Sequence, residues 1–176
     1  MKHPDFYFLP NYSLSEDVRG FMLAQSDTKF VHEMIDAGYR VNVFALRSVG
    51  ASDYPANPLD VSAELTIGGA RYEKSNTRNL IGKGLLYFRA IRMLRAFILD
   101  ARGLIYIYYP GTICLFGAVF AMLAKKPFAL YVRGDWNYRL DFRSLSGFLF
   151  RRSEFLIVTG PGFVQKISPY NPNVQP

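Results

Sequence analysis

Residues 104–136 read LIYIYYPGT, ICLFGAVFAMLAKKP and FALYVRGDW, in which two short apolar runs flank a longer one. The first short run is rich in Ile and Tyr and stops at Pro110-Gly111, and the last stops at Arg133-Gly134-Asp135. This pattern predicts a strand, a helix and a second strand. Because a crossover helix joins buried strands in parallel, with a right-handed connection, both strands should end at one edge of a sheet.

A membrane-spanning helix is the competing interpretation, because Leu104–Ala124 is 21 residues long and carries no charge. Pro110-Gly111 falls inside the run and would break a helix there. The Ile and Tyr residues before it favour a strand. The part after it, Ile113–Ala124, is only about 18 Å long as a helix. A buried strand followed by a helix therefore accounts better for the segment.

A second unit of this kind stands near the N-terminus. Phe6–Leu9 is an apolar run that predicts the first strand. Asp27 or Thr28 is a suitable N-cap for a helix that Gly38 ends, and Arg40–Leu46 follows as the second strand. The alternation predicts an α/β fold with a doubly wound, mostly parallel sheet.

The remaining elements are weaker predictions. We expect a helical turn within Glu16–Leu23, a loop over Ser48–Asp60, a hairpin or edge turn at Gly68-Gly69, a long helix over Arg78–Ala101 that starts at Asn76 or Thr77, a short helix over Ser144–Arg152, a strand at Phe155–Val158 and helical turns over Phe163–Ile167. The domain would span residues 1–168. Residues 169–176, rich in Pro and Asn, read as a bare tail or the start of an interdomain linker.

Composition narrows the class of protein. Half of the 176 residues are hydrophobic, which favours a globular domain. The net charge of +7 favours anionic partners, although it can also serve solubility alone. The single cysteine, Cys114, excludes an internal disulfide framework and a cysteine zinc site, and fits a reducing compartment. The N-terminus lacks a signal-peptide pattern, so we expect a cytoplasmic protein. Nothing in the sequence calls for a metal or a cofactor.

The long helix carries a basic face. At 100° per residue, Arg89, Arg92 and Arg95 gather opposite the apolar side, together with Leu85, Phe88 and Leu99. Arginines mixed with large apolar groups are typical of a helix that lies peripherally on an anionic membrane surface. A solvated helix whose apolar residues contact a neighbouring element is the alternative.

Four predicted parallel strands end in four turns of special composition: Pro10–Ser13, Pro110–Thr112, Arg133–Trp136 and Thr159–Gly162. In a doubly wound sheet, ligands bind outside the carboxyl ends of the strands. Glycines let the backbone approach a ligand, helix N-termini favour anions, and an arginine fork suits phosphate or carboxylate. An aspartate there could accept sugar hydroxyls or act as a base, and the indole offers a face for a sugar. The expected cleft residues are Asn11, Tyr12, Gly111, Thr112, Arg133, Gly134, Asp135, Trp136, Gly160 and Gly162.

Common catalytic motifs are missing from the sequence. It contains no G-x-G-x-x-G, no G-x-x-x-x-G-K-[ST] and no G-x-S-x-G motif. The sequence therefore gives no support to dinucleotide binding, to a P-loop nucleotide site or to a serine nucleophile of the elbow type. His3 stands at the start of the chain and His32 in the first helix, where a packing or surface role is the simpler interpretation. No basic stripe with interleaved aromatics marks a nucleic-acid surface, so we expect no nucleic-acid partner.

Three stretches resemble one family. FVHEMIDAGYRVNVFAL (30–46), AKKPFALYVRGDW (124–136) and RRSEFLIVTGPGFVQKI (151–167) are similar to the N-terminal domain of GT-B fold glycosyltransferases of the family-four type. The resemblance implies a Rossmann-like domain that holds a glycan or lipid-linked acceptor, while a second domain holds the nucleotide-sugar donor. Many members act at the cytoplasmic face of the membrane, in polysaccharide or glycolipid synthesis of the bacterial type.

The sequence departs from that family in three ways. PNYSLSEDVRG replaces the usual glycine-rich loop after the first strand, Arg133 stands where the family often has His, and the donor domain with its pair of glutamates is absent. The resemblance therefore implies an acceptor-binding half that is inactive alone. It assigns no catalytic residues, and it implies that a nucleotide-sugar binds only when a second domain is present. The alternative is a non-catalytic module that binds an anionic glycan, a lipid headgroup or a partner protein.

Overall fold

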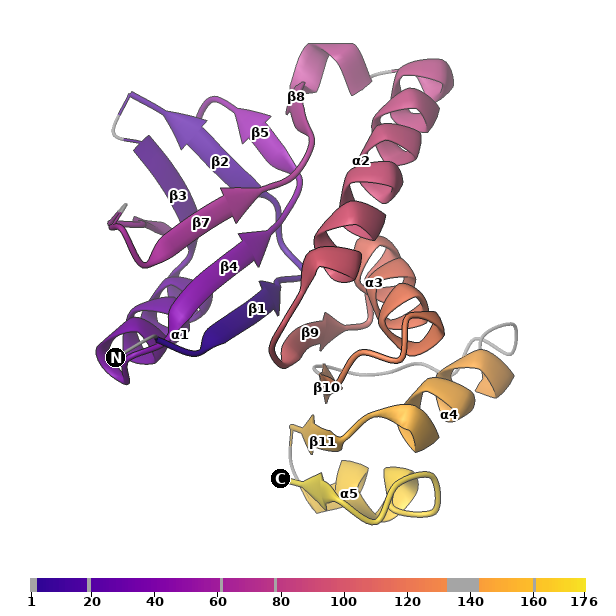
Figure 1. Cartoon of the computed structure of the whole chain (residues 1–176). Coiled ribbons are helices and arrows are strands. Elements are labelled where there is room, and N and C mark those ends of the chain that lie inside the picture. Colours follow the sequence, from indigo (N-terminus) through magenta and orange to yellow (C-terminus); the bar gives the residue numbers. More distant parts are fainter. Residues whose placement is uncertain (1–2, 19, 61, 78, 133–142, 160) are drawn as a thin grey trace.

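The computed structural model describes residues 3–18, 20–60, 62–77, 79–132, 143–159 and 161–176. Within them, seven strands form an all-parallel main sheet in the order β12-β11-β10-β9-β1-β4-β7 (Figure 1). Their bounds are β1 Asp5–Leu9, β4 Arg40–Phe44, β7 Leu65–Gly68, β9 Ile105–Tyr109, β10 Phe128–Val132, β11 Phe155–Val158 and β12 Val174–Gln175. The α/β class with a doubly wound parallel sheet is confirmed.

The central unit has the predicted form. β9 leads into α3 (Thr112–Leu123) and then into β10, and the two strands run parallel with Tyr109 opposite Val132. All five residues of β9 are buried, because both faces of this strand are covered. In the described part of the chain, no helix is both long enough and apolar enough to cross a membrane.

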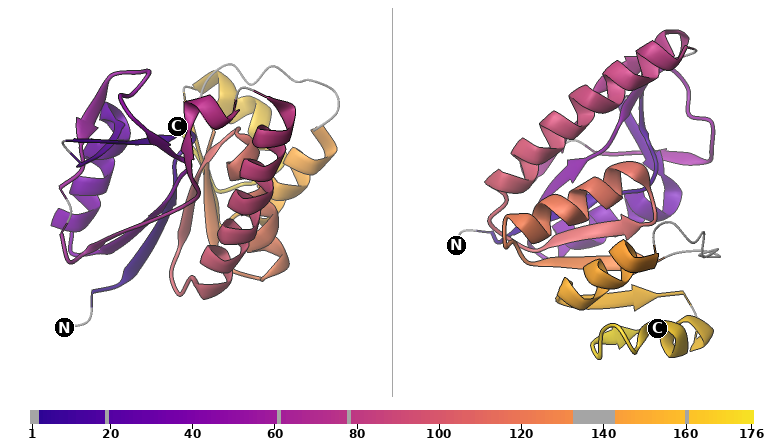
Figure 2. Two further views of the ribbon diagram at one scale, coloured as in Figure 1. Left: turned by 90° about the horizontal axis from the view of Figure 1, so that it is seen from above. Right: turned by 90° about the vertical axis from the view of Figure 1, so that its right-hand side faces the viewer.

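The winding of the sheet reverses beside β1. From β1 the chain proceeds outward to β4 and β7, then returns to β9 on the other side of β1 and continues to β10, β11 and β12. Right-handed crossovers in opposite directions place their helices on opposite faces. Accordingly α1 (Gln25–Asp36) packs on one face, and α2 (Leu80–Asp100), α3, α4 (Arg143–Arg152) and α5 (Pro161–Ile167) pack on the other (Figure 2).

A second, mixed sheet continues one half of the main sheet. Its order is β6-β3-β2-β5-β8, with bounds β2 Leu14–Asp17, β3 Gly20–Ala24, β5 Arg47–Val49, β6 Ala56–Pro58 and β8 Arg71–Glu73. β2, β5 and β8 directly follow β1, β4 and β7 in the chain and keep the same order of neighbours. Three adjacent strands therefore bend together and carry on as a wall above the carboxyl edge.

Of the two structures expected at Gly68-Gly69, a hairpin or a turn between edge strands, the bend agrees with the second, because β7 and β8 are edge strands of the two sheets. β7 pairs with β4 in the main sheet and β8 pairs with β5 in the second sheet, so the two strands are not partners of each other. Gly69 has φ +130°, and a Cβ there would lie 1.7 Å from the backbone oxygen of Ala45. Glycine is needed because the chain changes direction against a neighbouring backbone.

The helical turn expected within Glu16–Leu23 is wrong. β2 and β3 form an antiparallel pair in which Ser15 opposes Met22. The carboxylate of Glu16 pairs with Arg47 Nη2 at 3.2 Å and Arg71 Nε at 3.1 Å, across β2, β5 and β8. A segment this short gains little from helix formation, so pairing with distant strands decides its structure. For the same reason, β5 and β6 occupy parts of the loop expected over Ser48–Asp60.

The long helix starts later than expected. A short 3₁₀ turn covers Lys74–Thr77, and α2 then begins at Leu80, not at Asn76 or Thr77. The side chain of Asn79 accepts a hydrogen bond from the backbone N–H of Gly82 at 2.6 Å, which caps the helix.

Residues 169–176 were expected as a bare tail or the start of an interdomain linker, and the structure rules out a bare tail because part of this segment belongs to the main sheet. β12 pairs in parallel with β11, with Val174 opposite Leu156. Asn171 is buried, and its side-chain amide donates to the backbone oxygens of Phe150 and Ser153, each at 2.9 Å. A polar segment can be structural where its amide side chains replace backbone partners.

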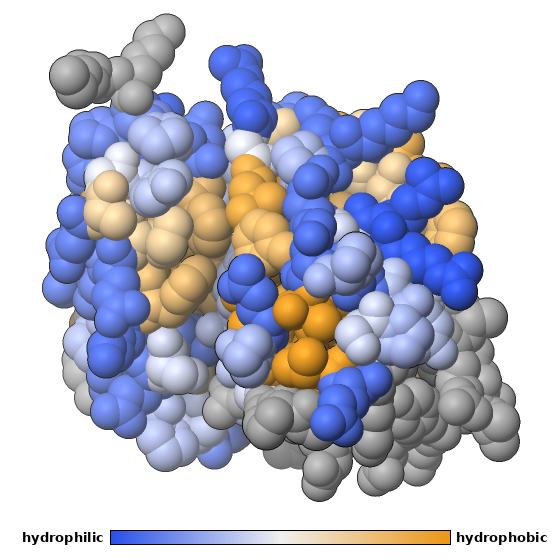
Figure 3. All heavy atoms as spheres, turned by 90° about the horizontal axis from the view of Figure 1, so that it is seen from below, coloured by the Kyte–Doolittle hydropathy of each residue, from blue (hydrophilic) through white to orange (hydrophobic). Residues whose placement is uncertain are grey.

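Two cores lie on the two faces of the main sheet. The larger one is formed with α2 to α5, and the smaller one lies under α1. Tyr131, Phe155 and Ile157 of β10 and β11 are only partly buried on the smaller side. Seen from below, apolar residues gather in the middle of the molecule between hydrophilic margins (Figure 3).

Candidate functional site

A cavity of about 250 Å³ opens at the carboxyl edge of the main sheet, where β1, β4 and β9 end. This is the point at which the winding of the sheet reverses, the usual ligand site of such folds. The cavity draws on the turn after β1, the bend after β4, the start of α3 and one residue of α2. It is lined by Pro10, Asn11, Tyr12, Ser13, Ala45, Leu46, Tyr87, Thr112, Ile113 and Cys114.

The start of α3 forms one wall of the cavity. The first intrahelical bond runs from the Leu115 N–H to the Gly111 oxygen at 2.7 Å. The N–H groups of Thr112, Ile113 and Cys114 precede it and have no carbonyl partner within the helix. Together with the helix dipole, they make this wall favourable for a negatively charged group.

The Asn11 side chain lies against the turn that precedes α3. A Cβ on Gly111 would fall 2.0 Å from the Asn11 Oδ1 atom. Gly111 has an extended φ of −179°, so close approach, not backbone strain, explains the glycine. The absence of a side chain at Gly111 thus lets an amide from the β1 turn reach the N-terminus of the helix that follows β9.

Aromatic rings form the rim of the cavity. Tyr12 is 40% exposed, and its ring lies 5.1 Å from that of Tyr54, centroid to centroid. Tyr87 reaches the cavity from α2. Such rings offer apolar faces and hydroxyl groups on the same side chain, a combination that suits a sugar ring.

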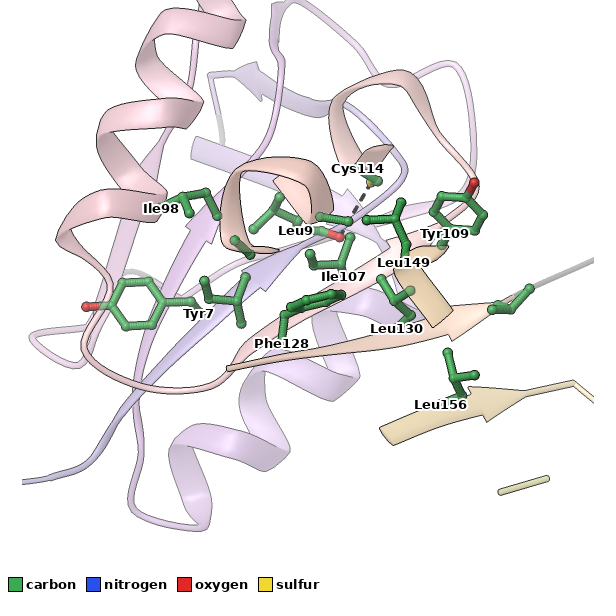
Figure 4. Packing of buried hydrophobic residues seen from close by; sticks show 14 of the residues in the cluster. Tyr7, Leu9, Ile98, Ile107, Tyr109, Cys114, Phe128, Leu130, Leu149 and Leu156 are labelled. Atoms are coloured by element: carbon green, nitrogen blue, oxygen red, sulfur yellow. Dashed lines mark hydrogen bonds between the residues drawn. The ribbon is translucent and has the colours of Figure 1, made fainter. Parts of the chain in front are cut away.

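Cys114 is part of the packing and is not a nucleophile. It is 1% exposed, and its Sγ approaches the Leu9 oxygen at 3.8 Å and the Pro10 oxygen at 3.5 Å (Figure 4). Burial, reinforced by the negative charge of Asp27, raises the pKa of the thiol to about 12. A thiol that stays neutral at physiological pH cannot attack a substrate.

The raised pKa predicts an alkaline loss of stability. The unfolded chain releases the Cys114 proton near pH 9.0, whereas the folded protein holds it to about pH 12. Below the unfolded pKa the contribution to stability is complete. Above it, we expect the free energy of unfolding to fall by up to about 1.4 kcal/mol per pH unit from this group. Urea unfolding of the protein and of Cys114→Ala at a series of pH values measures the effect.

Buried tyrosines add to the same loss at higher pH, because burial raises the pKa of Tyr54, Tyr106 and Tyr109 above 10.0. The free energy of unfolding of Cys114→Ala should therefore lack only the part of the alkaline decrease that begins at the lowest pH. Equal slopes for the two proteins between about pH 9 and pH 10 would contradict the assignment to this thiol.

Asp27 is a buried carboxylate that the sequence interpretation missed. Asp27 or Thr28 was expected as the N-cap, but α1 begins at Gln25 without a side-chain cap, and Asp27 lies in its first turn at 0% exposure. The Ser26 hydroxyl donates to Asp27 Oδ1 at 3.0 Å. Its charge contributes to the raised pKa of Cys114 and, after burial and Tyr131, of Tyr106. Asp27 therefore lies close enough to the cavity edge to influence Cys114 there.

The structure brings together four of the expected cleft residues. Asn11, Tyr12 and Thr112 line the cavity, and Gly111 lies against Asn11. Gly162 lies in α5, after β11. Arg133, Gly134, Asp135, Trp136 and Gly160 lie outside the described residues.

Sequence reasoning did not identify Ala45, Leu46 and Tyr87 as lining residues. Their roles depend on the bend between the two sheets and on where α2 passes, for which the sequence carries no local signal. Arg89, Arg92 and Arg95 are exposed on α2, as expected of a basic outer face. In the described ranges, no group of three or more His, Cys, Asp or Glu residues could hold a metal ion.

A wider groove of about 830 Å³ runs beside α1 and β6. His32 lies half-buried in it, with Nε2 lacking a hydrogen-bond partner among the described residues. The groove mixes charges of both signs, including the Lys29–Glu33 pair at 3.7 Å. It lies away from the reversal point of the sheet, so it is the weaker candidate.

Comparison with known proteins adds no relative. No family model matches the chain, and no curated protein shows significant similarity to it. The function must therefore be argued from the cavity and the residues around it.

Proposed function

We propose that this chain is the acceptor-binding, N-terminal half of a GT-B fold glycosyltransferase of the family-four type, moving a sugar from a nucleotide-sugar to a glycan or lipid-linked acceptor. The observation that carries the proposal is the position of the cavity, at the carboxyl edge where the winding reverses between β1 and β9. The resemblance of residues 30–46, 124–136 and 151–167 to that family supports the same assignment.

The chemistry of the cavity suits a sugar or a sugar phosphate. Its volume of about 250 Å³ lies below that of drug-sized sites, roughly 300–1,000 Å³, and fits one ring or one phosphate group. The Asn11 amide and the Thr112 hydroxyl can pair with hydroxyl groups, and the N–H groups of Thr112 and Ile113 at the start of α3 can hold an anionic oxygen.

The donor would bind outside the described residues, in a second domain. β10 ends at Val132 and β11 at Val158, on the same edge as the cavity, so an acceptor there would face a partner domain across this edge. The nucleotide-sugar would thus be held only when such a domain completes the cleft.

One observation favours the second candidate, a non-catalytic module that binds an anionic glycan or a lipid headgroup. Among the described residues, the cavity lining contains no Asp, Glu or His, and its single thiol is held neutral by burial. Binding without turnover is what such a lining supports on its own. Both candidates share the ligand class and differ in whether a second domain adds chemistry.

The binding prediction is tested by titrating the protein with glucose 1-phosphate and with inorganic phosphate while recording amide resonances. The N–H signals of Thr112 and Ile113 should shift most, because they face the cavity. Asn11→Ala should weaken binding about tenfold, the effect of one hydrogen bond of about 1.4 kcal/mol. Asn57→Ala, an exposed asparagine of β6, is the matched control and should leave affinity unchanged.

The same titrations can also contradict the proposal. Unchanged α3 amides with both ligands would overturn the cavity as a sugar-phosphate site. A sugar-nucleotide turnover assay separates the two candidates: the chain alone should be inactive, and a candidate donor domain should restore turnover if the enzyme assignment holds. Robust turnover by the isolated chain would show that the catalytic groups lie elsewhere.

A further inference from the structure

Helix α2 exposes large apolar residues to an unusual degree. Side-chain exposure is 86% for Leu80, 75% for Ile81, 66% for Leu85 and 70% for Phe88. These residues occupy the N-terminal half of the helix, whose end lies at one extremity of the molecule (Figures 1 and 2). Four large apolar side chains exposed within three turns form a patch that monomeric proteins rarely leave without a partner.

The exposed residues form one stripe with helical spacing. Counting three or four residues at a time, the stripe runs through Ile81, Leu85, Phe88, Arg92, Arg95 and Leu99, with Arg89 beside it. The opposite side of the helix holds Ala90, Leu94 and Ile98, all fully buried against the main core. α2 therefore has an inner face that is satisfied and an outer face that no described element covers.

The charge of this outer face selects the partner. No acidic residue occurs from Leu80 to Leu99, and none of the three arginines forms an ion pair with a described residue. A second copy of this face would bring six unpaired guanidinium groups into one interface, which is costly when charges are desolvated. The partner must supply negative charge and also accept Ile81, Leu85 and Phe88.

We propose that the outer face of α2 docks the protein on an anionic lipid bilayer. The apolar N-terminal half enters the boundary between headgroups and acyl chains, and Arg89, Arg92 and Arg95 lie at the level of the phosphates. Helices of this composition lie in the plane of the interface, held by apolar burial and by attraction to anionic lipids. A nucleic acid would satisfy the arginines but leave the aliphatic side chains in water.

Docking in this way brings the cavity to the membrane. Tyr87 lies between Leu85 and Phe88 in the sequence, yet it turns inward to line the cavity at the start of α3. The cavity rim would then stand beside the headgroup layer, within reach of the polar end of a lipid-linked acceptor. The docking itself does not require sugar chemistry, so it can hold even if the proposed function fails.

Vesicle co-sedimentation tests the proposal with the full chain. We expect binding to phosphatidylcholine vesicles that contain about 30 mol% phosphatidylglycerol, weak binding to phosphatidylcholine alone, and a loss at high salt. Changing Arg89, Arg92 and Arg95 together to Gln should weaken binding about a hundredfold. Ile81→Ser combined with Phe88→Ser should weaken it at least tenfold. All these side chains are outside the core, so thermal unfolding should change little.

A charge-matched control separates the location of the arginines from net charge. Changing Lys29, Lys125 and Arg151 to Gln removes the same total charge from other exposed positions and should leave vesicle binding nearly unchanged. Asn11→Ala should also bind vesicles normally, which keeps this test independent of the cavity. Equal losses in the two triple variants would overturn the assignment to α2.

Insertion can be measured at one position. Phe88→Cys can be labelled selectively with an environment-sensitive fluorophore, because the native Cys114 is buried and its thiol stays neutral. The fluorescence should rise on anionic vesicles and stay constant with a DNA duplex. A duplex that competes fully with vesicles, or a stable dimer of the free protein that hides the label, would contradict the lipid proposal.

Discussion

Replacing Gly69 with alanine is expected to lower the free energy of unfolding by about 3 to 5 kcal/mol. Two costs combine at this position. The φ of +130° is one that residues with a Cβ rarely adopt, and the added Cβ would lie 1.7 Å from the Ala45 oxygen and 2.8 Å from its carbonyl carbon. Because the contact is with backbone, no side-chain rotation can relieve it.

The consequence reaches beyond local strain, because Gly69 lies where β7 of the main sheet passes into β8 of the second sheet. Next to it, the Arg47 N–H donates to the Ala70 oxygen at 2.9 Å, and the Ala45 N–H donates to the Gly68 oxygen at 3.2 Å. Moving the chain away from Ala45 would break this pairing at the bend. Ala45 also lines the cavity, so ligand binding should weaken together with stability.

Two other glycines make the measurement specific. Gly50 has φ +104° but open space around its Cβ position, so Gly50→Ala isolates the conformational cost at about 1 kcal/mol. Gly84 lies on α2 with no neighbour within 4 Å, and Gly84→Ala should stabilise the protein by about 0.5 to 1 kcal/mol. Urea unfolding gives all three values. If Gly69→Ala cost no more than Gly50→Ala, the close approach of the two strands would be disproved.

The bend at Gly69 also marks the boundary between the parts of the fold that the sequence predicts and those that it does not. The unit β9–α3–β10 was predictable because its strands are almost entirely buried and Pro110-Gly111 follows the first of them. The second sheet was not predictable, because its strands are three to five residues long and each pairs with a segment distant in sequence. A pair of glycines signals a change of direction but does not say whether the chain returns on itself or bends away.

The residues of the candidate site also fall into those that the sequence predicts and those that depend on tertiary structure. Asn11, Tyr12, Gly111 and Thr112 follow from the rule that parallel strands end at one edge, which needs no knowledge of the bend. Ala45 and Tyr87 enter the cavity only through tertiary placement of the bend and of α2. Asp27 illustrates a different failure: its position before a helix matched a capping preference, but burial in the first turn took precedence over it.

The second large effect is expected at Asn171, in the segment whose composition indicated a bare end. Asn171→Ala should lower the free energy of unfolding by about 2 to 4 kcal/mol. The side chain is 4% exposed, and its Nδ2 donates to the backbone oxygens of Phe150 and Ser153, while its Oδ1 accepts from the Asn173 N–H at 2.8 Å. Alanine would leave these two carbonyl oxygens and this N–H without a hydrogen-bond partner. Water cannot take the place of the amide, because the site is buried.

Asn173→Ala provides the matched control, because Asn173 is exposed and its side chain makes one hydrogen bond within the described ranges, to the Glu154 oxygen at 3.2 Å. Its cost should stay below about 1 kcal/mol. Asn171→Asp should be at least as harmful as Asn171→Ala, since a carboxylate would face the carbonyl oxygens that the amide now donates to. Similar costs for Asn171→Ala and Asn173→Ala would show that the buried amide does not stabilise the fold.

Deleting residues 169–176 should exceed the cost of the point substitution. It removes Asn171 and also β12, leaving the Leu156 N–H of β11 without its bond to the Asn173 oxygen at 3.3 Å and uncovering an edge strand of the main sheet. We therefore expect the shortened chain to unfold at lower urea concentration and to self-associate, as measured by sedimentation velocity. A monomeric, equally stable deletion variant would contradict a structural role for the segment, whereas the expected losses would make β12 an integral strand of the domain.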